Sequence, residues 1–253
     1  MIGKNNPLIK ESLKLKQKKY RDELNKFLIE GVRFVEEAIK ENFVEYIFYS
    51  NKILDSKYSY ILDWDVKKYE VNEDVIKELS DTENPQGVVA VCKKRENRAD
   101  LKDFVVIADG VQDPGNLGTI IRTLDAAGAD ALIIIKGTVD PYNSKTLRST
   151  MGSIFRVPIV YFDDFEKASD YLKNKGFNIY ATSLEAEKLI YDYNFNEKTA
   201  LVIGNEANGI SKEHIDLSTH KIKIPMIGKA ESLNAAVASA IVIYEVVRQR
   251  LTR

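Results

Sequence analysis

The chain has 253 residues, a formal net charge of −1 at pH 7 and a single cysteine, Cys92. This length exceeds the usual size of one domain and favours two domains. One cysteine cannot close an intramolecular disulfide, and the two histidines, His214 and His220, add too few soft ligands for a structural zinc site. We therefore expect neither a disulfide nor a bound metal.

The apolar runs and the N-terminal sequence predict a cytoplasmic protein that does not associate with membranes. The uncharged run in the last expected helix, Ser232 to Tyr244, is well below the roughly 18 residues that span a bilayer. The first ten residues, MIGKNNPLIK, lack the apolar core of a signal peptide.

The N-terminus carries a basic segment. Asn6 followed by Pro7 is typical of a helix N-cap with proline at the first helical position, so the sequence predicts a basic helix running toward Lys18. Residues 1–21 contain seven Lys or Arg against one acid, Glu11. Such runs are more often a solvated helix face than a nucleic-acid-binding surface. The basic segment alone therefore does not establish RNA binding.

The first 97 residues alternate short apolar strands with helices. Strands are predicted at 27–29, 44–50, 66–71 and 87–94, and helices at 31–40 and after an Asn72 cap. The polar stretch Lys93–Asp100 follows and is the expected linker. We therefore divide the chain into a domain at 1–97 and a second domain at 98–253.

The second domain restarts the alternation with longer apolar strands. These are expected at 104–108, 131–135, 157–162, 178–183, 199–204 and 220–225, with helices at 116–128, 163–175 and about 232–251. Such a pattern predicts an α/β fold whose mostly parallel sheet is covered on both faces. Ligands bind beyond the carboxyl ends of such strands. The last helix carries an apolar stripe that could be core or an interface: Leu233, Ala236, Val237, Ala240, Ile241, Tyr244 and Val247.

Three segments of this domain could form a site: DGVQDPGNLGTIIRTLDAAGA (109–129), LVIGNEANGIS (201–211) and IPMIGKAESLNAAVASA (224–240). Each contains a short loop, after an apolar strand, whose small residues leave backbone N–H and C=O groups open to a ligand. The glycine spacing in the first segment is not G-x-G-x-x-G, and no Gly-Lys-Ser/Thr follows. The pattern therefore favours a cofactor pocket other than a dinucleotide fold or a P-loop.

Each candidate side chain also has an ordinary structural explanation. Asn116 could be the N-cap of the helix that carries Arg122, whose charge near the helix start would suit an RNA phosphate. Glu206 follows a strand in a tight turn and could be solvated surface. Ser232 and Asn234 could cap the last helix, although capping leaves Asn234, two positions inside it, unexplained. Neither histidine has a setting that suggests a Ser–His–Asp triad.

The three segments, in this order and at these separations, resemble the signature motifs of the SpoU (TrmH) branch of the SPOUT RNA methyltransferases. The resemblance to the catalytic domain of this family extends from Phe104 to the C-terminus. The resemblance implies that S-adenosylmethionine binds in a deep trefoil knot, an exception to the rule that chains avoid threading loops, and that a ribose 2′-hydroxyl of RNA is methylated. The implied catalytic residues are Asn116, Arg122, Glu206, Ser232 and Asn234. The implied cofactor-binding residues are Thr182, Ser183, Leu184, Ile203, Gly204, Asn205, Glu206, Gly209, Ile224, Met226, Ser232 and Leu233.

The first 97 residues resemble, less specifically, the ribosomal-protein-like substrate-binding domain often fused in front of this catalytic domain. Members with this extension mostly modify large-subunit ribosomal RNA, so the resemblance implies a 23S RNA substrate. It also implies a homodimer. The alternatives are a transfer-RNA 2′-O-methyltransferase, a non-catalytic RNA-binding or ribosome-assembly protein of the same fold, and a nucleotide-dependent enzyme of ordinary doubly wound type. The target nucleotide and the proton acceptor stay open.

Overall fold

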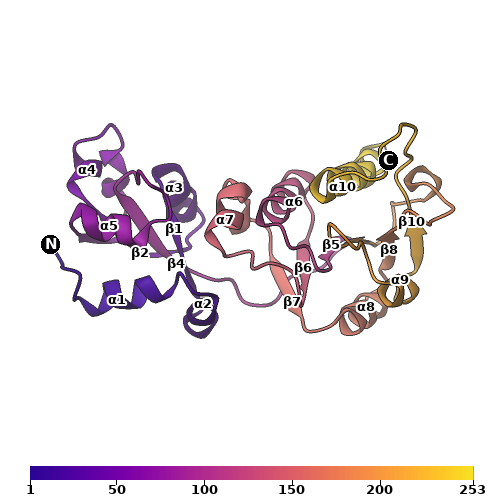
Figure 1. Ribbon diagram of the computed structural model, residues 1–253, viewed down its shortest axis with the longest axis horizontal. Coiled ribbons are helices and arrows are strands. Elements are labelled where there is room, and N and C mark those ends of the chain that lie inside the picture. Colours follow the sequence, from indigo (N-terminus) through magenta and orange to yellow (C-terminus); the bar gives the residue numbers. More distant parts are fainter. Residues whose placement is uncertain (253) are drawn as a thin grey trace. The chain divides into compact units, whose positions relative to one another are not determined.

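The computed structural model describes residues 1–252 and divides into two compact units (Figure 1). The N-terminal unit comprises Met1–Glu96 together with Tyr142–Phe155, and the C-terminal unit comprises the other described residues. Within residues 1–252, no helix has both the length and the apolar character needed to cross a membrane.

The N-terminal unit is built on a four-stranded mixed sheet in the order β1-β4-β2-β3. The strands are β1 (Lys26–Glu30), β2 (Val44–Tyr49), β3 (Lys67–Glu70) and β4 (Val88–Lys93), and β2 and β3 are the parallel pair. Helices α3 (Val32–Lys40) and α5 (Glu73–Leu79) stand where the sequence predicts them, and the short α4 (Asn51–Leu54) and η1 (Ser59–Asp63) are additional. Asn72 precedes α5, but its side chain makes no capping hydrogen bond.

The basic N-terminal segment forms two helices, so the expectation of one helix toward Lys18 was wrong. The Asn6 cap is confirmed, because its side chain accepts from the Leu8 N–H at 2.9 Å. However, α1 (Pro7–Lys14) ends early and α2 (Lys18–Leu24) follows. Arg21, only 6% exposed, donates to the carbonyl oxygens of Leu15 and Lys16 at 2.8 and 2.9 Å. It satisfies carbonyl groups left open where α1 ends, so Arg21 is structural.

The segment Tyr142–Phe155 contains α7 (Ser144–Thr150) and η2 (Ser153–Phe155), neither of which we predicted. Its aromatic residues pack in the N-terminal unit, with ring centroids 4.7 Å apart for Phe27 and Tyr142 and 5.3 Å for Phe34 and Phe155. The available sequence signal was Asn143, whose side chain accepts from two N–H groups at the start of α7.

The C-terminal unit has a six-stranded sheet in the order β10-β8-β9-β5-β6-β7, and every pairing is parallel. The strands are β5 (Phe104–Ala108), β6 (Ala131–Ile135), β7 (Ile159–Phe162), β8 (Asn178–Thr182), β9 (Thr199–Ile203) and β10 (His220–Ile222). Helices α6 (Pro114–Ala127) and α10 (Ala235–Leu251) pack together on one face, and α8 (Phe165–Asn174) and α9 (Lys212–Leu217) cover the other (Figure 1). The predicted α/β fold with a parallel sheet is confirmed.

The strand order reverses between β5 and β9, the two central strands. From β5 the chain builds outward through β6 and β7, whereas β8 and β10 lie on the other side of β9. Such a switch point leaves a crevice at the carboxyl ends of the two strands. The Asp109 N–H donates to the Ile203 carbonyl at 2.9 Å, so both strands end side by side.

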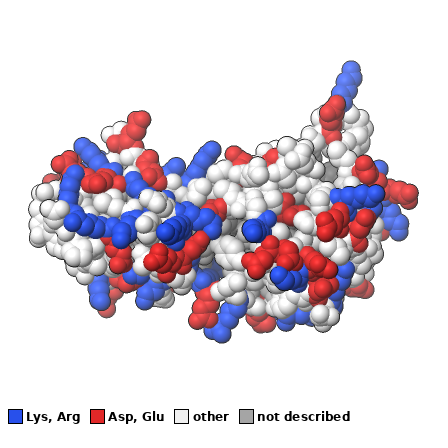
Figure 2. Space-filling model, turned by 60° about the horizontal axis from the view of Figure 1, so that its bottom comes forward, with Lys and Arg blue, Asp and Glu red and all other residues white. Residues whose placement is uncertain are grey.

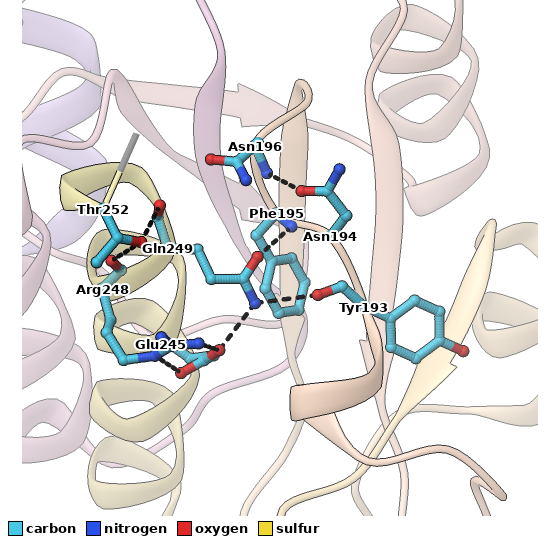
Figure 3. Close-up of polar contacts among 8 residues, drawn as sticks. All are labelled: Tyr193, Asn194, Phe195, Asn196, Glu245, Arg248, Gln249 and Thr252. Atoms are coloured by element: carbon cyan, nitrogen blue, oxygen red, sulfur yellow. Dashed lines mark hydrogen bonds and ion pairs between the residues drawn. The ribbon is translucent and has the colours of Figure 1, made fainter.

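The last turns of α10 are fastened to the chain that enters β9 (Figure 3). The Gln249 side chain accepts from the Phe195 N–H at 2.8 Å and donates to the Tyr193 carbonyl at 3.0 Å and to Glu245 at 2.8 Å. Two nitrogens of Arg248 donate to the buried Glu245 carboxylate at 2.8 and 2.7 Å. These hydrogen bonds lower the pKa of Glu245 despite its burial. This cluster fixes where α10 lies on its face of the sheet.

The apolar stripe expected on the last helix is only partly buried: Ala236 lies in the core, whereas Leu233, Val237 and Tyr244 are exposed. The face of α10 that enters the core carries Ala236, Ser239, Val242, Ile243, Glu245 and Val246. Val237 and Tyr244, both on the expected stripe, are each 49% exposed. Of the two possibilities that the sequence left open, core and interface, core therefore accounts for Ala236 but not for the exposed residues of the stripe.

Gln249→Glu tests the α10 cluster. The change is isosteric, but it places a carboxylate oxygen against the Tyr193 carbonyl and the Glu245 carboxylate, where the amide nitrogen now donates. We expect a loss of about 1 to 3 kcal/mol in the free energy of unfolding, measured by denaturant titration. Gln17→Glu is the matched control, because Gln17 is exposed and makes no capping hydrogen bond. Equal stability of both variants would contradict the role of Gln249.

Candidate active site

Glu206 lies in the loop after β9 and is bonded to the loop after β5. One carboxylate oxygen accepts from the Gln112 N–H at 3.0 Å, and the other accepts from the Asp113 N–H at 3.0 Å and from the Asn116 side-chain amide at 3.0 Å. Burial raises the pKa of this carboxyl, but the hydrogen bonds from Asn116, Gln112 and Asp113 outweigh it and lower the pKa below its ordinary value. Glu206 is therefore a carboxylate that positions its neighbours.

Asn116 connects Glu206 to the start of α10. Its side-chain oxygen accepts from the Asn234 amide at 2.9 Å, while the Asn234 oxygen accepts from the N–H groups of Ala236 and Val237 at 2.9 and 3.3 Å. The helix begins at Ala235, so Asn234 is its N-cap and does not lie inside the helix as we expected.

The alternative interpretation of Asn116, as the N-cap of α6, is wrong. The N-cap is Asp113, which accepts from the Asn116 N–H at 2.8 Å and is followed by Pro114 at the first helical position. The Asp-Pro pair gave this signal in the sequence. Because Asp113 takes over the cap, the Asn116 side chain is free to bridge Glu206 and Asn234.

Arg122 and Ser232 remain outside this hydrogen-bonded group. Arg122 is exposed on α6, six residues after Asn116. Ser232 is exposed in the segment before α10. Within the described residues 1–252, neither side chain makes a hydrogen bond or an ion pair. The structure thus links three of the five predicted catalytic residues and leaves two open to solvent.

The loop after β9 is a tight turn closed by its own backbone. Asn205 and Gly209 exchange two backbone hydrogen bonds at 3.0 and 2.9 Å, and the Asn205 side chain donates to the Gly110 carbonyl at 2.9 Å. A Cβ at Gly204 would lie 2.5 Å from the Gly209 carbonyl carbon and 2.6 Å from the Ile210 nitrogen. Since both contacts are with backbone, any side chain at Gly204 must displace the turn.

The other predicted cofactor-binding residues follow neighbouring strands. The Thr182 hydroxyl at the end of β8 donates to the Val202 carbonyl at 3.0 Å, and the Ser183 N–H donates to the Ile222 carbonyl at 2.9 Å. Leu184 is 65% exposed, Leu233 is 36% exposed, and Ile224 and Met226 are half-buried in the segment after β10. Because β10, β8, β9 and β5 are consecutive in the sheet, these loops share one edge.

One pair at this edge was missed by reasoning from the sequence. The Asp109 carboxylate, directly after β5, lies 2.6 Å from Nδ1 of His214 on α9. The His214 ring also stacks on Phe165, with centroids 4.5 Å apart and an 11° angle between planes. The only sequence signal was an acid directly after a buried strand.

The residues at this edge can orient ligands through fixed donors and acceptors. Glu206, Asn116 and Asn234 form a chain of hydrogen-bonded carboxylate and amide groups, beside the turn that the backbone of Asn205 and Gly209 closes. Arg122 supplies an exposed cation. Such a set suits the alignment of two reactants better than nucleophilic catalysis by the protein.

The chain belongs to the SpoU rRNA Methylase family, whose sequence pattern matches residues 103–244. The pattern of an MRM3-like substrate binding domain matches residues 6–90. Both matches agree with the resemblance seen in the motifs.

Similar proteins align along nearly the whole chain. The 23S rRNA (guanosine(2553)-2′-O)-methyltransferase RlmP of Bacillus subtilis is 39% identical over 94% of this chain and 95% of its own. A 23S rRNA (uridine(2479)-2′-O)-methyltransferase of Streptomyces viridochromogenes is 32% identical over 92% and 86%. The crystal structure of the SpoU methyltransferase AviRb from Streptomyces viridochromogenes with AdoMet superposes with a TM-score of 0.89 and 29% identity, covering 98% of this chain and 99% of that chain.

Glu206→Gln tests the positioning carboxylate. Three donors converge on Glu206, so an amide NH2 faces at least one of them in either orientation. We expect a lower melting temperature than wild type. A lowered folded pKa gives stability that is present above the unfolded value near 4.5 and is lost as pH falls through the folded pKa. The difference in melting temperature should therefore stay constant from about pH 5.5 to 8 and shrink in stronger acid. A difference that persists undiminished at about pH 2.5 would contradict this account.

Proposed function

We propose that this protein transfers the methyl group of S-adenosylmethionine to a ribose 2′-hydroxyl of 23S ribosomal RNA. The observation that carries the proposal is the likeness to RlmP over 94% of the chain, which includes both units. The bonded group of Glu206, Asn116 and Asn234 supports it, because these residues belong to three different motifs and meet at one edge of the sheet.

In this reaction the ribose 2′-oxygen attacks the methyl carbon, the carbon–sulfur bond breaks, S-adenosylhomocysteine leaves and the hydroxyl proton is released. Bound S-adenosylmethionine supplies the electrophilic methyl group. We assign Arg122 to the phosphate beside the target ribose and to the developing charge on the 2′-oxygen. Asn116, Ser232 and Asn234 position the ribose and the methyl donor, and Glu206 orients this group. A guanidinium stays protonated at neutral pH, so the proton acceptor is left unassigned.

The cofactor site comprises the loops 182–185, 203–209 and 224–233, which act chiefly through backbone groups. The close approach of backbone at Gly204 supports this assignment, because only a residue without a side chain lets backbone segments come this near to each other. The fold of these loops into a deep trefoil knot stays a prediction from the family resemblance.

The domain at 1–97 binds the RNA, and the domain at 98–253 carries the catalytic residues. In Figure 2, Lys and Arg side chains are interspersed with Asp and Glu over the face shown, so no single sign of charge covers it. Several lysines of the basic segment already have acidic partners, such as Lys18 with Asp22 at 2.7 Å. Within residues 1–252, Lys10, Lys14 and Lys19 make no ion pair, which leaves them available for phosphates.

The protein acts in the cytoplasm as a homodimer. The half-exposed apolar side chains of α10, Val237 and Tyr244, support an interface on that helix. Sedimentation at micromolar concentration tests the dimer, and a monomer would contradict it.

Mapping of ribose methylation tests the proposed function directly. Ribosomal RNA from cells with and without the gene should differ at one 2′-O-methyl position in 23S RNA. The purified protein with S-adenosylmethionine should restore that methyl group to unmodified RNA. An unchanged 23S map together with a changed transfer-RNA map would instead support the transfer-RNA alternative.

Arg122→Ala and Gly204→Ala separate chemistry from cofactor binding. Since the assigned partners of Arg122 belong to RNA, Arg122→Ala should keep S-adenosylmethionine affinity near normal while methyl transfer falls by roughly two orders of magnitude. Gly204→Ala should lose cofactor affinity, because its Cβ meets the backbone at 2.5 Å. Calorimetry measures affinity, and single-turnover assays measure transfer. Transfer by Arg122→Ala at the wild-type rate would remove Arg122 from the mechanism.

Replacing Lys10, Lys14 and Lys19 by Gln tests RNA binding by the basic segment. Each lost phosphate contact should reduce the log–log slope of RNA affinity against salt by about one unit. The matched control replaces Lys4, Lys18 and Lys40, which pair with Glu78, Asp22 and Glu36, and removes the same charge. Equal slopes for both triple variants would place RNA contacts elsewhere. The full chain is used because Tyr142–Phe155 packs with the N-terminal unit.

A further inference from the structure

We infer that His214 is a positioning residue for S-adenosylmethionine binding, acting through its hydrogen bond to Asp109. The inference rests on the proposed function and concerns how the turn after β9 is held. None of the three motifs assigns a role to either residue.

The turn after β9 is bonded at its upstream end to the segment after β5. Asn205 donates to the Gly110 carbonyl at 2.9 Å, and Glu206 accepts from the Gln112 and Asp113 N–H groups at 3.0 Å. These bonds hold one side of the turn. They leave the downstream side, from Gly209 into α9, to be held by other contacts.

His214 provides that second attachment. It lies in α9, whose N-cap Ser211 accepts from the His214 N–H at 3.2 Å, so the ring is fixed to the residues directly after the turn. Its Nδ1 lies 2.6 Å from the Asp109 carboxylate, one residue before Gly110. The turn is thus attached to residues 109–113 at both ends, which closes a ring of bonds around 205–214.

Because Asp109 is buried, its carboxylate depends on the hydrogen bond from His214. Asp109 is 8% exposed, and within residues 1–252 His214 is the only side chain that hydrogen-bonds to its carboxylate. A buried carboxylate without its donor is costly. The ring of His214 is held in turn by the stack on Phe165 at the start of α8. The stack on Phe165 therefore orients the His214 ring, and the ring in turn holds the Asp109 carboxylate and the residues after the turn.

The consequence is preorganisation of the backbone that receives the cofactor. A turn attached at both ends loses less freedom when a ligand binds than a turn attached at one end. Loss of the His214 bond should therefore weaken S-adenosylmethionine binding and leave the transfer step, assigned to Arg122 and the RNA, largely unchanged once the site is saturated.

Two substitutions at this position separate the hydrogen bond from the stack. His214→Phe keeps an aromatic ring against Phe165 and removes the donor, whereas His214→Asn places an amide N–H near the position of Nδ1 and removes the ring. His220→Phe is the matched control, because the His220 ring contacts Tyr180 and Tyr193 and makes no side-chain hydrogen bond within residues 1–252.

Calorimetry with S-adenosylmethionine on the full chain should show affinity reduced about tenfold or more in His214→Phe and largely restored in His214→Asn. His220→Phe should bind like wild type. At saturating cofactor, turnover of His214→Phe should stay within about twofold of wild type. Wild-type affinity in His214→Phe, or equal loss in His214→Asn, would overturn the inference, as would lost turnover with unchanged affinity.

If His214→Phe does not fold, the double variant His214→Phe with Asp109→Asn replaces it, because it no longer buries an unpaired carboxylate. The attachment is still missing, so affinity should again be reduced, and wild-type affinity there would overturn the inference. Wild-type protein that binds no S-adenosylmethionine would instead refute the proposed function. The two failures are therefore distinguishable.

Discussion

The hydrogen bonds of Glu206 are the constraint on which the site depends. A single carboxylate from the loop after β9 accepts from two backbone N–H groups and one side-chain amide of the segment after β5. These groups are 90 to 94 residues away in the sequence. They meet because β5 and β9 are adjacent at the switch point of the sheet. The strand order therefore creates the site, and Glu206 sets its geometry.

The same bonds link capping to function. Asp113 caps α6 and Asn234 caps α10, so each helix start is fixed by a residue beside or within the site. Asn234 uses its oxygen for the cap and its amide for Asn116. Capping and positioning are thus performed by one side chain. At the other end of α10, Gln249, which also donates to Glu245, attaches the helix to the residues before β9.

The sequence predicted what depends on local pattern and composition. Continuous apolar strands predicted the parallel sheet, and the Asn6-Pro7 pair predicted the start of α1. It failed where a distant partner decides the outcome. Arg21 belongs to the basic segment that was a candidate for RNA binding, yet its side chain donates to the carbonyl groups at the end of α1. The sequence gives no signal for His214, because its partner, Asp109, lies 105 positions away. Pairings of this kind leave no periodicity to detect.

The structure distinguishes cations that stabilise the fold from cations that are open to a substrate, and composition alone does not make this distinction. Arg21 donates to carbonyl oxygens of its own segment, and Lys18 forms an ion pair with Asp22. The basic segment therefore has fewer cations available to RNA than its seven Lys and Arg imply. On the catalytic unit, Arg122 keeps its charge unpaired within residues 1–252 although acids are plentiful in the chain. An exposed cation without a partner forgoes the modest stability of an ion pair. That makes Arg122 better suited to a charge that arrives with the substrate than to one supplied by the fold.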